Sequence, residues 1–147
     1  MHSKLINWAT ATGEHAKTTS RFDLGLLVLR LSVGLLMLLA HGWSKLIGFA
    51  EKSASFPDPL GVGSAFSLGL TVFAEVFCSL AIIVGLLTRL SAVPLAITML
   101  VAAIVIHGDD PFQKQEFALI YFVHYLILMI MGAGKYSLDY TLWGGRR

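Results

Sequence analysis

The chain has 147 residues, of which 56% are hydrophobic and 14% are charged, and its formal net charge is +2. An ordinary soluble domain is about 45 to 50% apolar and about 25% charged, so this composition argues against a water-soluble protein. The small net charge and the scattered basic residues argue against a nucleic-acid surface. The single cysteine, Cys78, excludes an internal disulfide and a CxxC redox motif.

Residues 1–21 are polar and mixed, and they lack the compact apolar run and the cleavage site of a secretory signal. We predict that they form a cytoplasmic tail or a short interfacial helix around Leu5, Ile6 and Trp8. The rest of the chain is predicted to comprise a transmembrane domain at residues 22–133 and a cytoplasmic or interfacial C-terminal tail at residues 134–147.

Four apolar runs make up the predicted transmembrane domain. They extend from about Phe22 to Leu46, Ala65 to Leu87, Leu90 to Ile106 and Phe117 to Met131. A helix needs about 20 residues to cross a hydrocarbon core of about 30 Å, and the last run reaches this length only with its flanking residues. Since lipid offers backbone groups no hydrogen-bond partners, we predict an all-α fold, a four-helix bundle that spans the lipid bilayer.

The basic residues predict the orientation of this bundle. In a protein with four spans, both termini and the turn between the second and third helices share one side, which carries Lys4, Lys17, Arg21, Arg89, Lys135, Arg146 and Arg147. On the opposite side, the few lysines are accompanied by more acidic residues. The positive-inside rule therefore predicts that both termini are cytoplasmic.

The connections between the helices differ in length. Thr88 and Arg89 are predicted to form the turn between the second and third helices, which makes these helices antiparallel neighbours. The loop at residues 47–64 contains FPDPLGVG, whose prolines and glycines are incompatible with a long regular helix. This loop could be a lid over a site or a plain connector.

Charged residues inside the apolar runs are the main candidates for function or helix pairing. Arg30, His41 and Lys45 fall on one face of the first helix, and Glu75 lies near the middle of the second. An arginine in a membrane span costs roughly 2.5 to 3.5 kcal/mol on insertion scales, so it usually faces a partner inside the bundle. We predict a structural ion pair between Arg30 and Glu75, which either fixes helix register or takes part in proton or substrate chemistry.

A second polar cluster is predicted at the outer ends of the helices. His41 and His107 end their helices, while Tyr121 and His124 share a face of the fourth helix. The same level holds further charged residues: Lys45, Asp109, Asp110 and Glu116.

Three kinds of chemistry fit the outer cluster. It could bind a quinone head group, with His or Lys donating to a carbonyl oxygen and Glu or His exchanging its proton. Paired imidazoles could ligate a metal or a haem, although the spacing of HGWSK is not a metal motif and neither HExxH nor CxxCH occurs. The histidines could also be interfacial side chains whose polar ends reach water.

Several motifs occur in a fixed order: LRLSVGLLMLLAHGWSKL at residues 29–46, FPDPLG, the central Glu75, GLLTRL at 85–90, His107, Glu116 and GAGKYSLD at 132–139. Over about residues 23–142, this set resembles the DoxX family of small four-helix bacterial membrane proteins. The resemblance places ten residues at recurrent family positions: Arg30, His41, Gly42, Lys45, Glu75, Arg89, His107, Glu116, Tyr136 and Asp139. His124 has no counterpart in this set.

The resemblance implies a bacterial inner-membrane protein associated with quinones, because the family includes subunits of quinone-linked oxidation systems and relatives linked to quinone resistance and thiol stress. We therefore expect a quinone-associated redox subunit. Its expected catalytic residues are Glu75, His41, His107 and Glu116, and its expected quinone-binding residues are Arg30, Lys45, His41, His107, Tyr121 and His124.

Other functions fit the same residues. Because the chain lacks a nucleotide fingerprint, a haem signature and a cysteine pair, it either handles quinone without a bound cofactor of its own or anchors a partner oxidoreductase. A non-enzymatic anchor or assembly subunit is therefore one alternative, and a small-molecule or lipid-binding or transport protein is another. Small residues such as Ala92 and Ala96 on the third helix would also allow close helix packing, either within one subunit or between two subunits of a homo-oligomer.

Overall fold

The computed structural model describes residues 20–144, and the predicted features around Leu5, Ile6 and Trp8 and at Arg146 and Arg147 lie outside them. In the described part, four helical spans are long and apolar enough to cross a membrane: Arg21–Ile47, Ser64–Val84, Thr88–Ile106 and Phe112–Met131. This result confirms the predicted all-α architecture with four spans. The cytoplasmic location of the termini stays a prediction.

Three of the spans contain a π-helical segment, in which the backbone hydrogen bonds run from residue i to residue i+5. The first span consists of α2 (Ser20–Met37), η1 (Leu38–Gly42) and α3 (Trp43–Ile47), the second of α5 (Ser64–Val72), η2 (Phe73–Cys78) and α6 (Ser79–Val84), and the third of α7 (Thr88–Val101) and η3 (Ala102–Ile106). The fourth span is α8 (Phe112–Met131), and the short helices α4 (Phe49–Lys52) and α9 (Leu138–Trp143) lie outside the spans.

The fourth helix begins at Phe112, so its polar first turn supplies the flanking residues that the short apolar run from about Phe117 was expected to need. One predicted boundary is corrected by the structure. The connection between the second and third spans is formed by residues 85–87, and Thr88 and Arg89, the predicted turn, already belong to α7.

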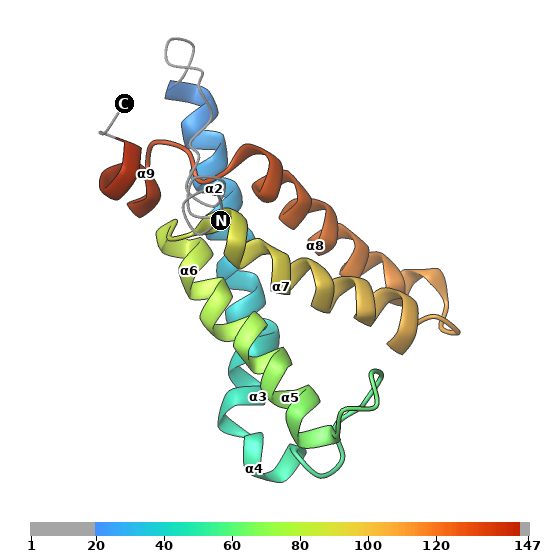
Figure 1. The fold of residues 1–147 in the computed structure, drawn as a ribbon. Coiled ribbons are helices and arrows are strands. Elements are labelled where there is room, and N and C mark those ends of the chain that lie inside the picture. Colours follow the sequence, from blue (N-terminus) through green and yellow to red (C-terminus); the bar gives the residue numbers. More distant parts are fainter. Residues whose placement is uncertain (1–19, 145–147) are drawn as a thin grey trace, which may run out of the picture.

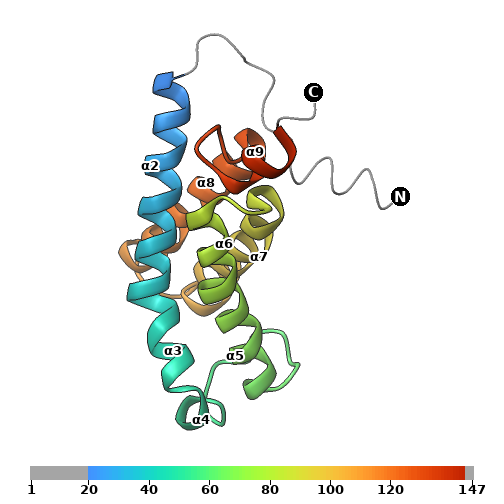
Figure 2. The same cartoon turned by 90° about the vertical axis from the view of Figure 1, so that its left-hand side faces the viewer.

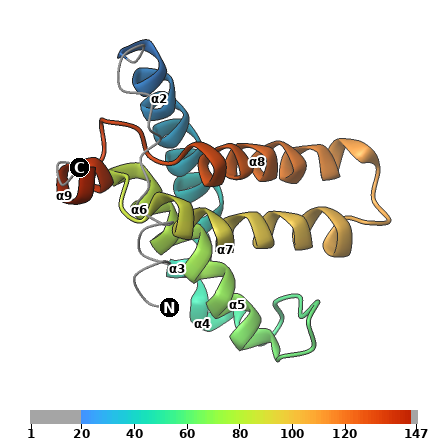
Figure 3. The same cartoon turned by 45° about the horizontal axis from the view of Figure 1, so that its top comes forward.

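The spans form two antiparallel pairs that meet at one end of the molecule (Figures 1 and 2). The first pair is α2 with α6, and the second is α7 with α8. Toward the opposite end, α7 and α8 diverge from α5, and the loop that precedes α5 lies on the side of α5 that faces them (Figure 3). We call the end with residues 85–87 and 132–143 the turn end, and the end with residues 48–63 and 107–111 the loop end.

Side-chain burial agrees with a bundle surrounded by lipid. Leu95, Tyr125 and Leu128 are completely buried in the core, to which both α7 and α8 contribute. Many large apolar side chains point outward instead, among them Leu39, Ile47, Phe117 and Ile130. Helices that are apolar on all faces are typical of membrane spans.

Arg30 is completely buried at the turn end and binds backbone carbonyl groups. Its Nη1 donates to the carbonyl oxygens of Ile82 at 3.1 Å and Ile83 at 3.2 Å, and its Nη2 donates to the carbonyl oxygen of Tyr136. The last carbonyl groups of a helix have no partner within that helix, and lipid supplies none. Arg30 therefore caps the C-terminal end of α6 and ties the C-terminal segment to it.

The predicted ion pair between Arg30 and Glu75 does not form, because the two side chains lie at different depths. Arg30 is level with Ile82 and Ile83, which follow Glu75 by seven and eight residues. This separation corresponds to about 11 Å along a helix. The helix α2 extends past the end of α6, which places Arg30 beyond the level of Glu75 (Figure 2).

Asp139 performs the matching role at the start of α7. Its carboxylate accepts hydrogen bonds from the backbone amides of Leu87 at 2.6 Å and Thr88 at 2.9 Å, and its own amide donates to the carbonyl oxygen of Gly85 at 2.8 Å. Burial raises the pKa of the Asp139 carboxyl, an effect opposed by the hydrogen bonds from the two amides. The first amides of α7 are thus capped by a side chain that lies far along the sequence.

The start of α2 is joined to the same C-terminal segment. Asp23, also buried, accepts a hydrogen bond from the backbone amide of Lys135 at 3.0 Å. Ser137 then begins α9 by accepting a hydrogen bond from the amide of Tyr140. The predicted C-terminal tail is therefore packed against the bundle at the turn end.

Gly85 provides a test of the turn end, because it combines a left-handed backbone (φ 72°) with a position where a Cβ would lie 2.3 Å from Nη1 of Arg30. We expect Gly85→Ala to lower the free energy of unfolding in detergent by about 3 kcal/mol, through backbone strain and overpacking. Gly61 is the matched control, since it has φ 67° but open space around it. Gly61→Ala should cost only about 1 kcal/mol. Equal losses in the two variants would contradict the proposed close approach of Arg30.

Candidate functional site

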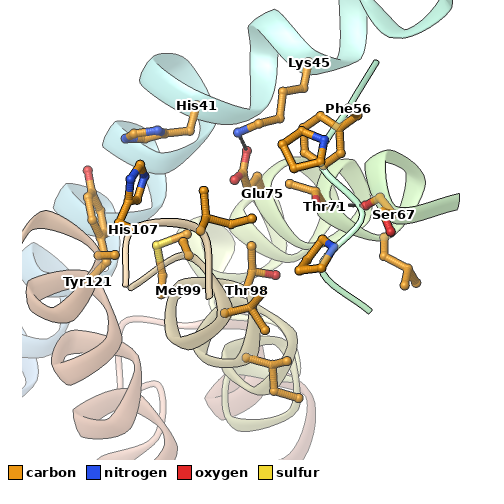
Figure 4. Close-up of a pocket in the computed structure, with 18 of the residues that line it drawn as sticks. His41, Lys45, Phe56, Ser67, Thr71, Glu75, Thr98, Met99, His107 and Tyr121 are labelled. Carbon is orange, nitrogen blue, oxygen red and sulfur yellow. Dashed lines mark hydrogen bonds and ion pairs between the residues drawn. The ribbon is translucent and has the colours of Figure 1, made fainter. Parts of the chain in front are cut away.

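A pocket of about 380 Å³ lies at the loop end, enclosed by all four spans and by the loop that precedes α5 (Figure 4). Most of its lining is apolar, with Phe56, Pro57, Pro59 and Leu60 contributed by the loop. Its polar lining residues are His41, Lys45, Ser67, Thr71, Glu75, Thr98, His107, Lys114 and Tyr121. An apolar pocket with a few convergent polar groups is the usual form of a small-molecule site.

Lys45 and Glu75 form an ion pair inside this pocket. The Lys45 Nζ lies 2.6 Å from Oε2 of Glu75, and the side chains are 22% and 4% exposed, respectively. Figure 4 shows the pair at the centre of the lining, between the imidazoles and Phe56. An isolated carboxylate is costly to bury, so the contact with Lys45 offsets the cost of burying Glu75 there.

At the level of this ion pair, the backbones of the first two spans approach each other closely. His41 lies in η1 and Glu75 in η2, and the two π segments pack against each other. A Cβ on Gly42 would lie 2.7 Å from the carbonyl oxygen of Glu75, so only glycine permits this contact. Single-turn π segments occur frequently at functional sites, and here they turn His41 and Glu75 toward one cavity.

Three ring side chains gather at one end of the pocket (Figure 4). The rings of His41 and Tyr121 meet edge to face, with centroids 5.9 Å apart and an interplanar angle of 85°. The third ring is that of His107, whose Nδ1 lies 2.8 Å from Oδ2 of Asp110. This end of the pocket therefore offers imidazole nitrogens and a phenol for hydrogen bonding or proton exchange.

The loop that covers the pocket is held in place by Asp58. Its carboxylate accepts hydrogen bonds from the amides of Val62 at 3.0 Å and Gly63 at 2.7 Å and from the hydroxyl of Ser67 at 2.7 Å. The Ser67 hydroxyl and the Gly63 amide hold the pKa of the Asp58 carboxyl below its usual value. Four loop residues line the pocket, two just before Asp58 and two between Asp58 and Val62, so the loop is part of the site and not only a connector.

The structure brings together some of the predicted site residues and separates others. His41, Lys45, Glu75, His107 and Tyr121 all line the pocket. Three others do not line it: Arg30 is at the turn end, Glu116 is exposed, and His124 has its Nδ1 2.6 Å from the carbonyl oxygen of Ile120. Within residues 20–144, no three His, Cys, Asp or Glu side chains are grouped to hold a metal ion.

Some residues of the site were not predicted from the sequence. Asp58 could have been found from the sequence itself, because an Asp shortly before glycines often accepts hydrogen bonds from their amides. Thr98 and Lys114 had no comparable signal, because their positions on the pocket wall depend on how α7 and α8 pack.

The ion pair between Lys45 and Glu75 predicts that substitutions of these two residues affect the free energy of unfolding non-additively. We expect Lys45→Met to lower the free energy of unfolding by about 3 kcal/mol, because it leaves the buried Glu75 without its partner. The double variant Lys45→Met with Glu75→Gln should lose less than the sum of the single losses, with a coupling of at least about 1 kcal/mol. Chemical unfolding in detergent micelles measures all three variants, and Lys52→Met on exposed α4 is the control. Additive losses would contradict a stabilising pair.

The anchor of the loop is tested by Asp58→Asn. An amide cannot accept all three hydrogen bonds, so we expect the amides of Val62 and Gly63 to exchange with deuterium at least about tenfold faster. In the wild type, the protection of these amides relative to intrinsic exchange at the same pH should fall as the pH decreases through the depressed pKa of Asp58, because protonation weakens the acceptor. Glu51→Gln, on the exposed helix α4, is the control. Unchanged exchange in Asp58→Asn would show that the loop is held by other contacts.

Comparison with known proteins agrees with this architecture. The family described as DoxX matches residues 25–108. The inner membrane protein YqjF of Escherichia coli is 32% identical over 126 residues, which cover 82% of this chain and 93% of YqjF. An uncharacterized protein of Haemophilus influenzae is 36% identical over 102 residues, which cover 66% of this chain and 68% of that protein. No solved structure matches the chain significantly. With four spans, matching motifs and these relatives, the chain belongs to the DoxX family of membrane proteins.

Proposed function

We propose that this DoxX protein is an inner-membrane, quinone-associated redox subunit and that its pocket binds the ring of a quinone. The pocket itself supports this proposal, because it is mostly apolar, lies at the ends of membrane spans and contains a buried Lys45–Glu75 ion pair. Its volume of about 380 Å³ lies near the lower end of the range of about 300 to 1,000 Å³ that is typical of small-molecule sites.

The polar groups of the pocket suit a ring with oxygen atoms at opposite ends. Lys45 can donate to a carbonyl oxygen near the centre of the site, while His41, His107 and Tyr121 lie together at one end (Figure 4). Phe56 and the prolines of the loop offer apolar contacts for the ring. Glu75 and the imidazoles are groups that can hold a proton next to a bound ligand.

The same proposal also specifies where in the membrane the pocket lies and which protein supplies the electrons for quinone reduction. The relative YqjF is named an inner membrane protein, and the basic residues at the turn end favour a cytoplasmic location for that end. The pocket then lies in the outer half of the membrane. Reduction of a quinone to a quinol takes up two electrons and two protons, and we assign the electrons to a partner oxidoreductase and the protons to the pocket residues.

The proposal predicts that a short-chain ubiquinone analogue binds to purified protein in lipid nanodiscs. We expect His41→Ala to weaken binding about tenfold, because the variant removes a polar contact and opens the end of the pocket. His124→Ala is the matched control, since His124 does not line the pocket. Equilibrium titration, followed by quenching of tryptophan fluorescence, measures the affinity.

The outcomes separate the candidate functions. Saturable binding that is weakened by His41→Ala and unchanged by His124→Ala supports the quinone site. Absence of quinone binding, together with co-purification of a soluble oxidoreductase, would contradict the site and favour an anchor. Movement of a solute into liposomes without quinone binding would favour the transport alternative.

A further inference from the structure

We propose that Asp110 is a positioning residue for the pocket, because it fixes His107 with Nδ1 as the protonated nitrogen and leaves Nε2 to accept a hydrogen bond from a ligand hydroxyl. This inference rests on the proposed quinone site and extends it. It predicts that the pocket prefers the reduced ring, which carries hydroxyl groups, over the oxidised ring, which carries only carbonyl oxygens.

The first step is the contact between the two side chains. His107 Nδ1 lies 2.8 Å from Oδ2 of Asp110, and the His107 ring lines the pocket beside His41 and Tyr121 (Figure 4). With Nδ1 occupied by Asp110, Nε2 is the ring nitrogen that remains for a ligand. The Asp110 side chain does not line the pocket itself.

The second step is the charge of Asp110. Its other oxygen accepts a hydrogen bond from the Lys114 Nζ at 3.2 Å. The hydrogen bonds from His107 and Lys114 hold the pKa of the Asp110 carboxyl below its usual value. An ionised carboxylate can only accept hydrogen bonds, so Nδ1 of His107 must carry the hydrogen, and Nε2 is then the acceptor whenever the ring is in its neutral form.

The third step concerns the hydrogen bonds that hold the connection between η3 and α8, residues 107–111, in place. The backbone amide of Asp110 donates to the carbonyl oxygen of His107 at 3.1 Å, which closes a turn. The Gln115 side-chain amide donates to the carbonyl oxygens of Gly108 at 3.2 Å and Asp110 at 3.1 Å. These bonds hold Asp110 on His107 independently of any ligand.

The consequence concerns which ligand forms the pocket recognises. Lys45 is a donor that suits a carbonyl or anionic oxygen, whereas Nε2 of His107 is an acceptor that suits a hydroxyl group. An oxidised ring would place a carbonyl oxygen against this acceptor, and neither atom could donate. A reduced ring supplies the missing hydrogen, so it should bind more tightly.

The tautomer can be measured without a ligand. Protein labelled with ¹⁵N in histidine and reconstituted in lipid should give a neutral His107 with protonated Nδ1 and unprotonated Nε2, identified by the signal that His107→Gln removes. Asp110→Asn should shift the population toward the tautomer protonated at Nε2, because an asparagine amide can donate to Nδ1. Asp109→Asn, an exposed neighbour, is the matched control and should leave the signal unchanged. A wild-type signal with Nε2 protonated would overturn the inference.

Ligand binding tests the same inference. We expect a short-chain ubiquinol analogue to bind wild-type protein and Asp109→Asn about fivefold to tenfold more tightly than the matching quinone, and Asp110→Asn to lose this preference. If both forms bind but Asp110→Asn keeps the wild-type preference, the positioning role is wrong and the quinone site stands. If neither form binds to the wild type, the proposed function is wrong, and the preference for the reduced ring falls with it.

Discussion

The structure depends on how the backbone groups between the second and third spans are satisfied in the packed turn end. Residues 85–87 break the helix, which leaves carbonyl groups at the end of α6 and amides at the start of α7 without helical partners. Arg30 binds the carbonyls and Asp139 binds the amides. Because Ile82 and Thr88 are completely buried and unpaired buried backbone groups are costly, these two buried side chains make the sharp connection possible and bring α2 and the C-terminal segment to it.

This arrangement separates the buried charges into two groups with different roles. Arg30 and Asp139 are bound to backbone groups at the turn end, so neither is available to the pocket. Glu75 is consequently paired with Lys45, close to the loop end, where the helix pairs diverge and the 380 Å³ pocket lies. One end of the bundle therefore carries the charges that hold the spans together, and the other carries those that line the pocket.

The sequence predicted the elements of the fold well and the polar partners less well. Hydrophobic length fixes the spans, and five of the eight predicted site residues do line one pocket. The partner of Arg30 depends on the offset between α2 and α6, and no pattern within either helix encodes that offset. Matching positive side chains with negative ones also does not predict that an arginine binds backbone carbonyl groups.

The histidines also show that the sequence alone does not determine which polar side chains meet. His41, His107 and His124 were grouped by their expected depth, but depth along a helix does not determine direction around it. His41 and His107 line the pocket, whereas His124 hydrogen-bonds within its own helix. The π segments alter the rotation of the residues that follow them and have no clear signature in the sequence; two of them, η1 and η2, pack against each other where Gly42 meets the backbone of Glu75.

The most direct test of the account is to identify what the pocket holds in the native membrane. The protein is purified gently into lipid nanodiscs, and extracted small molecules are quantified by mass spectrometry. Ala102→Phe fills the pocket, and Ala40→Phe changes an exposed position of η1 as a control. We predict a stoichiometric quinone in the wild type and in Ala40→Phe and its loss from Ala102→Phe. A wild-type protein without quinone, or equal quinone content in all three, would contradict the account.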